Sequence, residues 1–239
     1  MPTATYVPSL TEEIGPRVHP DPSMQKQDLV ARYPVLYHMA ELGSWPNIRE
    51  QGLLSTTASL DRAKVTADER RQLESHRRPA SVSISMTDGV ALVLRDQKPM
   101  SDARLKKCLL GGITPTQWYE FINRKTFFWA TQARLHTLLG AYDDREHDVL
   151  TVDTASLVQA HEDRIWLCHM NSGNTTPWAH PRDYEIFKRI HDYPASPRGY
   201  PVKEVAEVVV DYAVLDIARH VKGISRMRGS EVTDNAPYG

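Results

Sequence analysis

The sequence predicts an α+β fold, and three observations support this prediction. Its apolar runs are short and numerous, unlike the strands of a doubly wound parallel sheet. Helical patterns with their own capping residues lie between these runs, mainly in the first half of the chain. The glycine-rich motifs of dinucleotide-binding and P-loop folds are absent, as are the motifs of zinc ribbons and zincins. We therefore expect a mixed domain built around short strands.

The elements begin with a strand and a short helix. Residues 32–40 form a brief apolar run that Pro34 opens, which favours a strand over a helix. Ser44 is a plausible N-cap, Pro46 sits in the first turn that follows, and Gly52 ends the helix. We therefore expect a strand, a tight connection and a helix in this order.

A charged segment and a hairpin follow. Residues 61–79 are strongly charged and lack an adequate apolar stripe, so we expect a helix or loop at the rim, with a solvated face. Residues 81–97 alternate and then turn at Asp88 and Gly89, which indicates a hairpin, although a short helix in the second half also fits.

The second half of the chain alternates between helices and strands. Thr114 caps a helix over 114–125, the aromatic run at 126–131 is a strand, and a helix follows that ends at Gly140. Three more strands and one short helix are expected: strands at 147–154, 164–170 and 202–214, and a helix at 154–161.

The distribution of proline and apolar residues divides the chain into three segments. Residues 1–28 contain five prolines and few large apolar side chains, which is typical of an arm on the domain or a flexible lead. Residues 29–221 hold the organised domain. Residues 222–239 are polar and glycine-containing, so we expect a C-terminal tail.

The composition excludes several classes of function. Of 239 residues, 41% are hydrophobic and the formal net charge is -1, so a histone-like nucleic-acid binder is not expected. Both cysteines, Cys108 and Cys168, lie in or beside apolar runs, which favours buried thiols in a reducing cytoplasm over a disulfide framework. No apolar stretch approaches about 18 residues and no secretion signal is evident, so we expect a cytoplasmic protein without a membrane partner.

Three features are candidates for a site. His38 ends an apolar strand just before a turn, where a histidine either completes the core or projects into a cleft. Glu207 interrupts an apolar strand, and it lies either on a wet sheet face or on a cleft wall, where an unpaired carboxylate is costly. Alternation sends Phe128 to the face opposite Phe127 and Trp129, so one face of this strand offers a stacking platform.

Two adjacent His-Asp pairs invite a metal hypothesis. They are His147 with Asp148 and His191 with Asp192, as in the pairs that a helical phosphohydrolase uses. The first pair lies in a predicted strand, whereas that metal site needs its ligands on packed helices. We therefore expect no metal and assign the histidines to surface or capping positions.

The order of the candidates resembles the His–aromatic–Glu layout of the ADP-ribosyltransferase superfamily. The local match is to the DarT-like group, which modifies nucleic-acid bases. The segment LYHMAELGSWPNIREQGLLS is similar to its first motif, and Ala206-Glu207-Val208-Val209-Val210 resembles the strand that carries its catalytic glutamate. The first segment keeps the histidine, isoleucine and Gly-Leu-Leu-Ser positions, at His38, Ile48, Gly52, Leu53, Leu54 and Ser55. Three positions depart from the pattern, with Ala40 for Thr, Ser44 for Asn, and Phe and Trp for Tyr in TFFWAT.

This resemblance implies a fold, a reaction and two catalytic residues. The fold is an ADP-ribosyltransferase-like split sheet, mixed or antiparallel, with flanking helices. NAD is the co-substrate and no metal is needed. Glu207 binds the ribose and offsets the positive charge that develops when the nicotinamide bond breaks, as carboxylates do in glycosidases. His38 hydrogen-bonds a ribose hydroxyl.

Four further residues are candidates for NAD binding. Phe128 or Trp129 stacks on the cationic nicotinamide ring, and the sequence leaves open which of them points inward. Arg134 meets the pyrophosphate or is an exposed helix residue, and Ser55 closes the first motif. The polar segment at 170–174 is a loop near the cleft or a turn.

The sequence leaves the acceptor and one alternative function open. DNA, RNA, protein or water can receive the ADP-ribosyl group, and the basic residues in 62–78 and 104–107 suit phosphate contacts. The alternative is a non-catalytic module on the same fold that binds a nucleotide or a nucleic acid. The oligomeric state is not readable from the chain.

Overall fold

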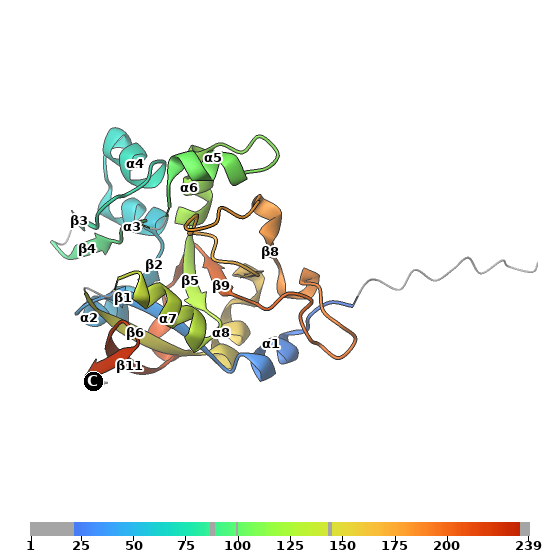
Figure 1. The fold of residues 1–239 in the computed structure, drawn as a ribbon. Coiled ribbons are helices and arrows are strands. Elements are labelled where there is room, and N and C mark those ends of the chain that lie inside the picture. The colour runs from blue at the N-terminus through green and yellow to red at the C-terminus, as the bar shows by residue number, and fades with distance from the viewer. Residues whose placement is uncertain (1–21, 87–88, 99, 143–144, 235–239) are drawn as a thin grey trace, which may run out of the picture.

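An eight-stranded antiparallel sheet forms the centre of the molecule (Figure 1). The computed structural model describes residues 22–86, 89–98, 100–142 and 145–234. The strand order is β12-β11-β6-β1-β5-β9-β7-β8, and helices pack on the sheet, which confirms the α+β class. The strands are β1 (Val35–Glu41), β5 (Lys125–Trp129), β6 (Glu146–Asp153), β7 (Ile165–Cys168), β8 (Phe187–Lys188), β9 (Glu207–Asp211), β11 (Val221–Arg228) and β12 (Glu231–Asp234).

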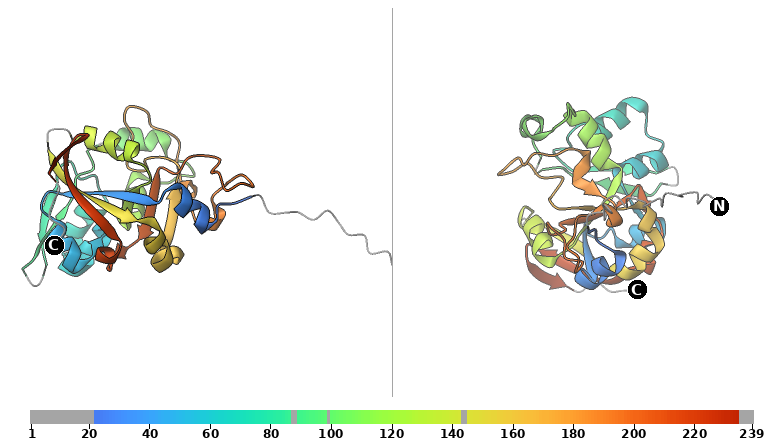
Figure 2. Two further views of the ribbon diagram at one scale, coloured as in Figure 1. Left: turned by 90° about the horizontal axis from the view of Figure 1, so that it is seen from below. Right: turned by 90° about the vertical axis from the view of Figure 1, so that its right-hand side faces the viewer.

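Helices cover one face of the sheet with a single large core. This face packs against α1 (Lys26–Arg32), α2 (Trp45–Gln51) and α8 (Thr154–His161). Leu36 from β1 and Phe128 from β5 are fully buried in this core. In the left view of Figure 2 the sheet strands run between α7 on one side and α2 and α8 on the other.

The opposite face carries two separate cores. One lies under α7 (Gln132–Gly140) and contains Met39 and Trp129, and the other lies under α5 (Asp102–Cys108) and α6 (Pro115–Asn123). The sheet opens between them, because β1 pairs with β5 only through Tyr37 and Trp129, whereas it pairs with β6 along all seven residues. This split allows a cavity between the two halves of the sheet.

Smaller elements wall this opening. Helices α3 (Thr56–Ala63) and α4 (Ala67–Glu74) gather with α5 and α6 above the sheet (Figure 1). Short strands complete the walls: β2 (Leu53–Leu54) pairs with β10 (Ala213–Val214), and β3 (Val82–Ser85) pairs with β4 (Ala91–Leu94). The described residues also include 3-10 helices in the connections before and after strands of the large sheet: η1 (Glu162–Arg164), η2 (Tyr184–Ile186), η3 (Ile190–Asp192) and η4 (Ile217–Arg219).

Local signals predicted where several elements begin or end. Ser44 is the N-cap of α2, and Gly52 is its C-cap with φ of 86°. Thr114 caps α6 with a reciprocal hydrogen-bond pair to Gln117, as the helix signal predicts. The predicted hairpin at 81–97 forms, although Asp88 of its expected turn lies outside the described residues.

The predicted C-terminal tail is wrong. Residues 221–228 form β11, which pairs along β6 and buries Ile224 and Met227. Ile224 is buried in the core shared with α1, α2 and α8, whereas Met227 is buried in the core under α7, so the buried side chains of β11 recur every third residue. Such a pattern lacks the period-2 alternation that identifies a strand in a sequence.

The N-terminal segment is partly described. Residues 1–21 of the expected arm lie outside the described residues. Met24 is fully buried and its amide donates to the Tyr193 carbonyl at 2.9 Å, so the described part of the segment packs on the domain. Helix α1 begins at Lys26, which places the start of organised structure before the expected boundary at 29.

Within the described residues, no helix combines the length and apolarity that a membrane crossing requires.

Candidate active site

A cavity of about 460 Å³ opens where β1 and β5 separate. His38 lines it from β1, Trp129 from β5 and Glu207 from β9, so the three predicted features converge on one space. Ser55 and the loop after β7 complete the wall around them. The sheet topology brings these residues together, because β9 pairs with β5, which adjoins β1.

Glu207 is the buried carboxylate of this cavity. It is 2% exposed, and its Oε1 accepts a hydrogen bond from the Ser172 amide at 3.1 Å. No described residue hydrogen-bonds its Oε2. Burial raises the pKa of the Glu207 carboxyl to about 7, although the Ser172 hydrogen bond and the charges of Arg182 and Arg134 act in the opposite direction. The carboxyl therefore titrates near neutral pH with one oxygen available to a ligand.

A buried arginine holds the loop that contacts Glu207. Arg182 is 1% exposed, and its guanidinium donates to the carbonyls of Ser172 and Asn174, each at 2.8 Å. Asn171 and Gly173 of the same loop line the cavity. The segment at 170–174 is therefore a polar loop at the cleft, one of the two expected alternatives.

His38 is neutral at pH 7. Burial lowers the pKa of its imidazole to about 4, and the charge of Arg95 acts in the same direction. Nδ1 lies 2.8 Å from the Phe127 carbonyl oxygen, which can only accept, so Nδ1 carries the proton. Nε2 is therefore an acceptor, suited to a hydroxyl donor in the cavity.

Alternation along β5 decides which aromatic residue faces the cavity. Phe127 and Trp129 line it, whereas Phe128 is fully buried in the core on the other face. The expectation that Phe128 stacks on a ligand is therefore wrong. Trp129 pairs directly with Glu207 across β5 and β9, so an aromatic ring and a carboxylate lie on neighbouring strands of one wall.

Two of the predicted binding residues have other roles. Arg134 is exposed on α7 and does not line the cavity, although its charge lowers the pKa of Glu207. Ser55 lines the cavity, but its Oγ accepts a hydrogen bond from the Ala58 amide at 3.1 Å and caps α3. The expectation that Arg134 meets a ligand here is therefore corrected.

Arg95 is the cation that the sequence analysis missed. It lines the cavity beside His38, and its Nη1 donates to the Met39 carbonyl at 2.9 Å. Within the described residues, Nε and Nη2 make no hydrogen bond, and Nε lies 3.8 Å from a carboxylate oxygen of Glu41. Arg95 thus keeps donors for an anionic ligand.

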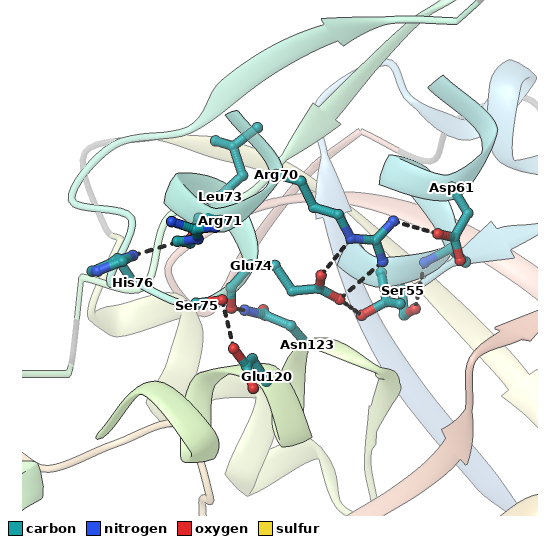
Figure 3. Close-up of polar contacts among 12 residues, drawn as sticks. Ser55, Asp61, Arg70, Arg71, Leu73, Glu74, Ser75, His76, Glu120 and Asn123 are labelled. Carbon is teal, nitrogen blue, oxygen red and sulfur yellow. Dashed lines mark hydrogen bonds and ion pairs between the residues drawn. The ribbon is translucent and has the colours of Figure 1, made fainter. Parts of the chain in front are cut away.

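Three charged side chains of the segment at 61–79, Asp61, Arg70 and Glu74, pair with one another (Figure 3). Arg70 binds Glu74 at 2.7 Å, and Ser75 donates to Glu120 of α6 at 2.7 Å. Most of the segment is exposed, as expected at a rim, but Leu73 and Arg78 are buried.

The guanidinium of Arg78 is fully engaged inside the fold. It donates to the carbonyls of Leu73 and Arg95 and to the side chains of Thr56 and Asn123. Arg78 thus links α3, the residues after β4 and α6, and it is unavailable for the phosphate contact that its charge suggests.

A model of DUF7002, a family of unknown function, matches residues 34–221. The chain belongs to this family. No curated protein matches the sequence.

The DUF7002 region contains the whole candidate site. All residues that line the cavity lie within 34–221, including His38 and Glu207. Strand β11 continues the sheet beyond the DUF7002 match.

Two DUF7002 residues important to the site escaped sequence reasoning. Arg95 follows the β4 strand and Arg182 lies in an irregular loop, where an arginine is ordinarily a surface residue. Only their tertiary neighbours identify them.

Proposed function

We propose that this DUF7002 protein is an NAD-dependent ADP-ribosyltransferase. The observation that carries the proposal is the convergence of His38, Trp129 and Glu207 on one cavity. Its volume of about 460 Å³ falls within the range of small-molecule sites. The proposal also rests on the resemblance of two sequence segments to DarT-like enzymes.

Glu207 supplies the group that this reaction needs most. Breaking the bond between nicotinamide and ribose leaves positive charge on the sugar, and a fixed carboxylate stabilises that charge. Its buried Oε2 accepts no hydrogen bond from the described part of the chain, a state that costs about 1–3 kcal/mol, and a ribose hydroxyl can relieve this cost by donating to it. Binding a cationic ring nearby favours the ionised carboxylate.

The other residues suit recognition of NAD. Nε2 of His38 accepts from a ribose hydroxyl, and the ring of Trp129 or Phe127 stacks on the flat nicotinamide cation. Arg95, in place of Arg134, is the cation that meets the pyrophosphate, because it keeps unpaired donors at the cavity.

The reaction transfers one group and releases one proton. The bond between C1′ of the ribose and the nicotinamide nitrogen breaks, and its electron pair neutralises the ring. The acceptor then bonds to C1′ and loses its proton. We infer a nucleic-acid base as the acceptor from the DarT-like resemblance, with protein and water as the other acceptors to be tested.

Nicotinamide release separates this enzyme from a binding module. We expect Glu207→Gln to leave NAD affinity within a few fold, because the shape of the side chain is kept, while turnover falls roughly 100- to 1,000-fold. His38→Ala should weaken NAD binding and lower turnover together. Release is measured with DNA, RNA and protein acceptors and with none, and affinity is measured by titration calorimetry.

Glu204 provides a matched control for the Glu207 variant. Glu204→Gln makes the same change three residues earlier, outside the cavity lining, and should keep wild-type turnover. If the wild type binds NAD but releases nicotinamide no faster than Glu207→Gln with every acceptor, the non-catalytic nucleotide-binding module replaces the enzyme.

A further inference from the structure

A second cluster of ligating side chains lies apart from the cavity. His161 ends α8, Asp216 precedes η4 and His220 follows it. One ligand atom from each of the three lies within 4.8 Å of the others. None of these residues lines the cavity, and they are not used by the proposed transferase.

The carboxylate of Asp216 lies between the two imidazole rings. Its Oδ1 is 2.7 Å from Nε2 of His161, and its Oδ2 is 3.3 Å from Nε2 of His220. The Asp216 side chain is 31% exposed, so the cluster is open to solvent on one side. Both histidine side chains are at least 90% buried.

His220 directs Nε2 at the Asp216 carboxylate. Its Nε2 makes no hydrogen bond within the described residues, despite its proximity to Asp216. Its Nδ1 lies 3.0 Å from the Ser156 hydroxyl, which can accept a hydrogen bond from a protonated Nδ1, and this tautomer has its lone pair on Nε2. A histidine that ligates a metal is commonly oriented through its second nitrogen in this way.

We propose that His161, Asp216 and His220 bind a divalent transition-metal ion of the Zn²⁺ class. Two imidazole nitrogens and one carboxylate are a ligand set that Zn²⁺ accepts, and its tetrahedral geometry places ligand atoms about 3.4 Å apart. The distances around Asp216 require only small side-chain movements to reach this spacing. The exposed side leaves a fourth position for water.

Arg164 opposes metal binding. Its Nη2 lies 2.7 Å from Nδ1 of His161, and because arginine only donates, Nε2 of His161 carries the proton in the metal-free form. When a metal occupies Nε2, that proton moves to Nδ1 and the contact with Arg164 breaks. The Nη1 of Arg164 keeps its bonds to the carbonyls of Asp211 and Ala213.

The metal ties α8 to the segment that supports the cavity wall. The η4 turn contacts α2, and the preceding β10 pairs with β2, whose Leu53 and Leu54 line the cavity. A ligand that binds only the folded chain stabilises it, so Zn²⁺ should raise the melting temperature.

Metal titration of the full, untagged chain tests the site. We expect one Zn²⁺ per chain by calorimetry, and visible d–d absorption bands of tetrahedral Co²⁺ when Co²⁺ replaces Zn²⁺. Asp216→Asn and His220→Ala should weaken Zn²⁺ binding at least about tenfold. Arg164→Gln should strengthen it, because the side-chain oxygen of glutamine can accept a hydrogen bond from the protonated Nδ1 of His161.

A histidine outside the cluster provides the control for Zn²⁺ affinity. His191→Ala removes an exposed histidine outside the cluster and should leave Zn²⁺ affinity unchanged. Far-ultraviolet circular dichroism verifies that each variant is folded, and Asp216→Asn is nearly isosteric. A wild-type chain that binds no stoichiometric Zn²⁺ at millimolar concentration, or Zn²⁺ affinity that is the same in Asp216→Asn and His220→Ala, overturns the proposal.

Discussion

Glu207 is a buried residue whose protonation couples stability to pH. Its carboxyl has a pKa of about 7 in the fold, against 4.5 ordinarily, because burial disfavours the charge. Between these two values the unfolded chain has lost the proton and the folded chain has kept it. The free energy of unfolding therefore falls as pH rises from about 4.5 to about 7, by roughly 3 kcal/mol for this group.

Comparing the wild type with Glu207→Gln isolates this effect. The glutamine does not titrate, so we expect the variant to gain roughly 3 kcal/mol of stability relative to the wild type between pH 4.5 and pH 8. Urea denaturation at several pH values measures the difference. A constant difference across this range would mean that Glu207 is ionised in the folded protein throughout.

Nicotinamide release should change in the opposite direction over the same range. The ionised form of Glu207 is the one that stabilises positive charge on the ribose, so kcat/KM should rise with an apparent pKa near 7. His38 is already neutral above pH 5 and should add no inflection near pH 7.

At the scale of elements, a close backbone approach anchors α2 beside the cavity. A Cβ at Gly52 would lie 2.6 Å from the Leu215 Cα and 3.1 Å from the Val214 carbonyl oxygen. Gly52 also has φ of 86°, a conformation that side chains disfavour. The connection after α2 therefore requires glycine for two separate reasons.

Two glycine variants separate these reasons. Gly52→Ala should lower the free energy of unfolding by at least about 3 kcal/mol, through backbone strain and overlap with Leu215. Gly43→Ala has a similar φ of 75° but no atom within 4 Å of its Cβ, so it should cost only about 1–2 kcal/mol. Urea denaturation of the two variants measures how much free energy of unfolding each one loses. Equal losses would argue against a steric contribution from Leu215 at Gly52.

The pairing of β11 with β6 predicts how the protein responds to deletion of its C-terminal residues. Deleting 222–239 removes the partner of β6 along with Ile224 and Met227, so the shortened chain should lose its cooperative thermal transition. Deleting only 231–239 removes β12, whose residues are all exposed, and should lower the melting temperature little. A cooperative transition in the shorter chain would restore the tail interpretation.

At the scale of the whole molecule, charge decides where a nucleic acid can bind. The net charge is -1, so local patches must supply any attraction. Arg70 and Arg78 are engaged within the fold, whereas Lys106 and Lys107 are exposed on α5, which packs against the cavity-lining helix α6. If nucleic acid is the acceptor, α5 offers one set of exposed cations for phosphate contacts, and Arg62, Lys64 and Arg71 of the charged segment offer another.

Charge reversal on two faces tests this location. Lys106→Glu with Lys107→Glu should weaken nucleic-acid binding and reduce its salt dependence by about two counterions. The matched control, Lys26→Glu with Arg219→Glu, changes the same charge on elements that pack against the other face of the sheet and should bind as the wild type does. If nucleic-acid binding changes neither with salt concentration nor in either double variant, a nucleic-acid acceptor is contradicted.

The sequence by itself determined the local elements and the main residues of the site. Capping residues and alternation predicted α2, α6, β5 and the hairpin, because these signals act between neighbours in the chain. His38 and Glu207 interrupt apolar patterns, so their chemistry was visible without a structure. Alternation also placed Phe128 opposite Trp129, although it left open which face was the cavity.

Only the tertiary structure decided what these residues meet. Arg95 and Arg182 acquire their roles from partners far apart in the chain, and β11 is a strand because β6 is there to pair with it. His161 and His220 approach one carboxylate only after the chain has folded. Such pairings arise from topology, since a periodic apolar pattern shows that a face of a segment is buried but not which distant segment packs or hydrogen-bonds against it.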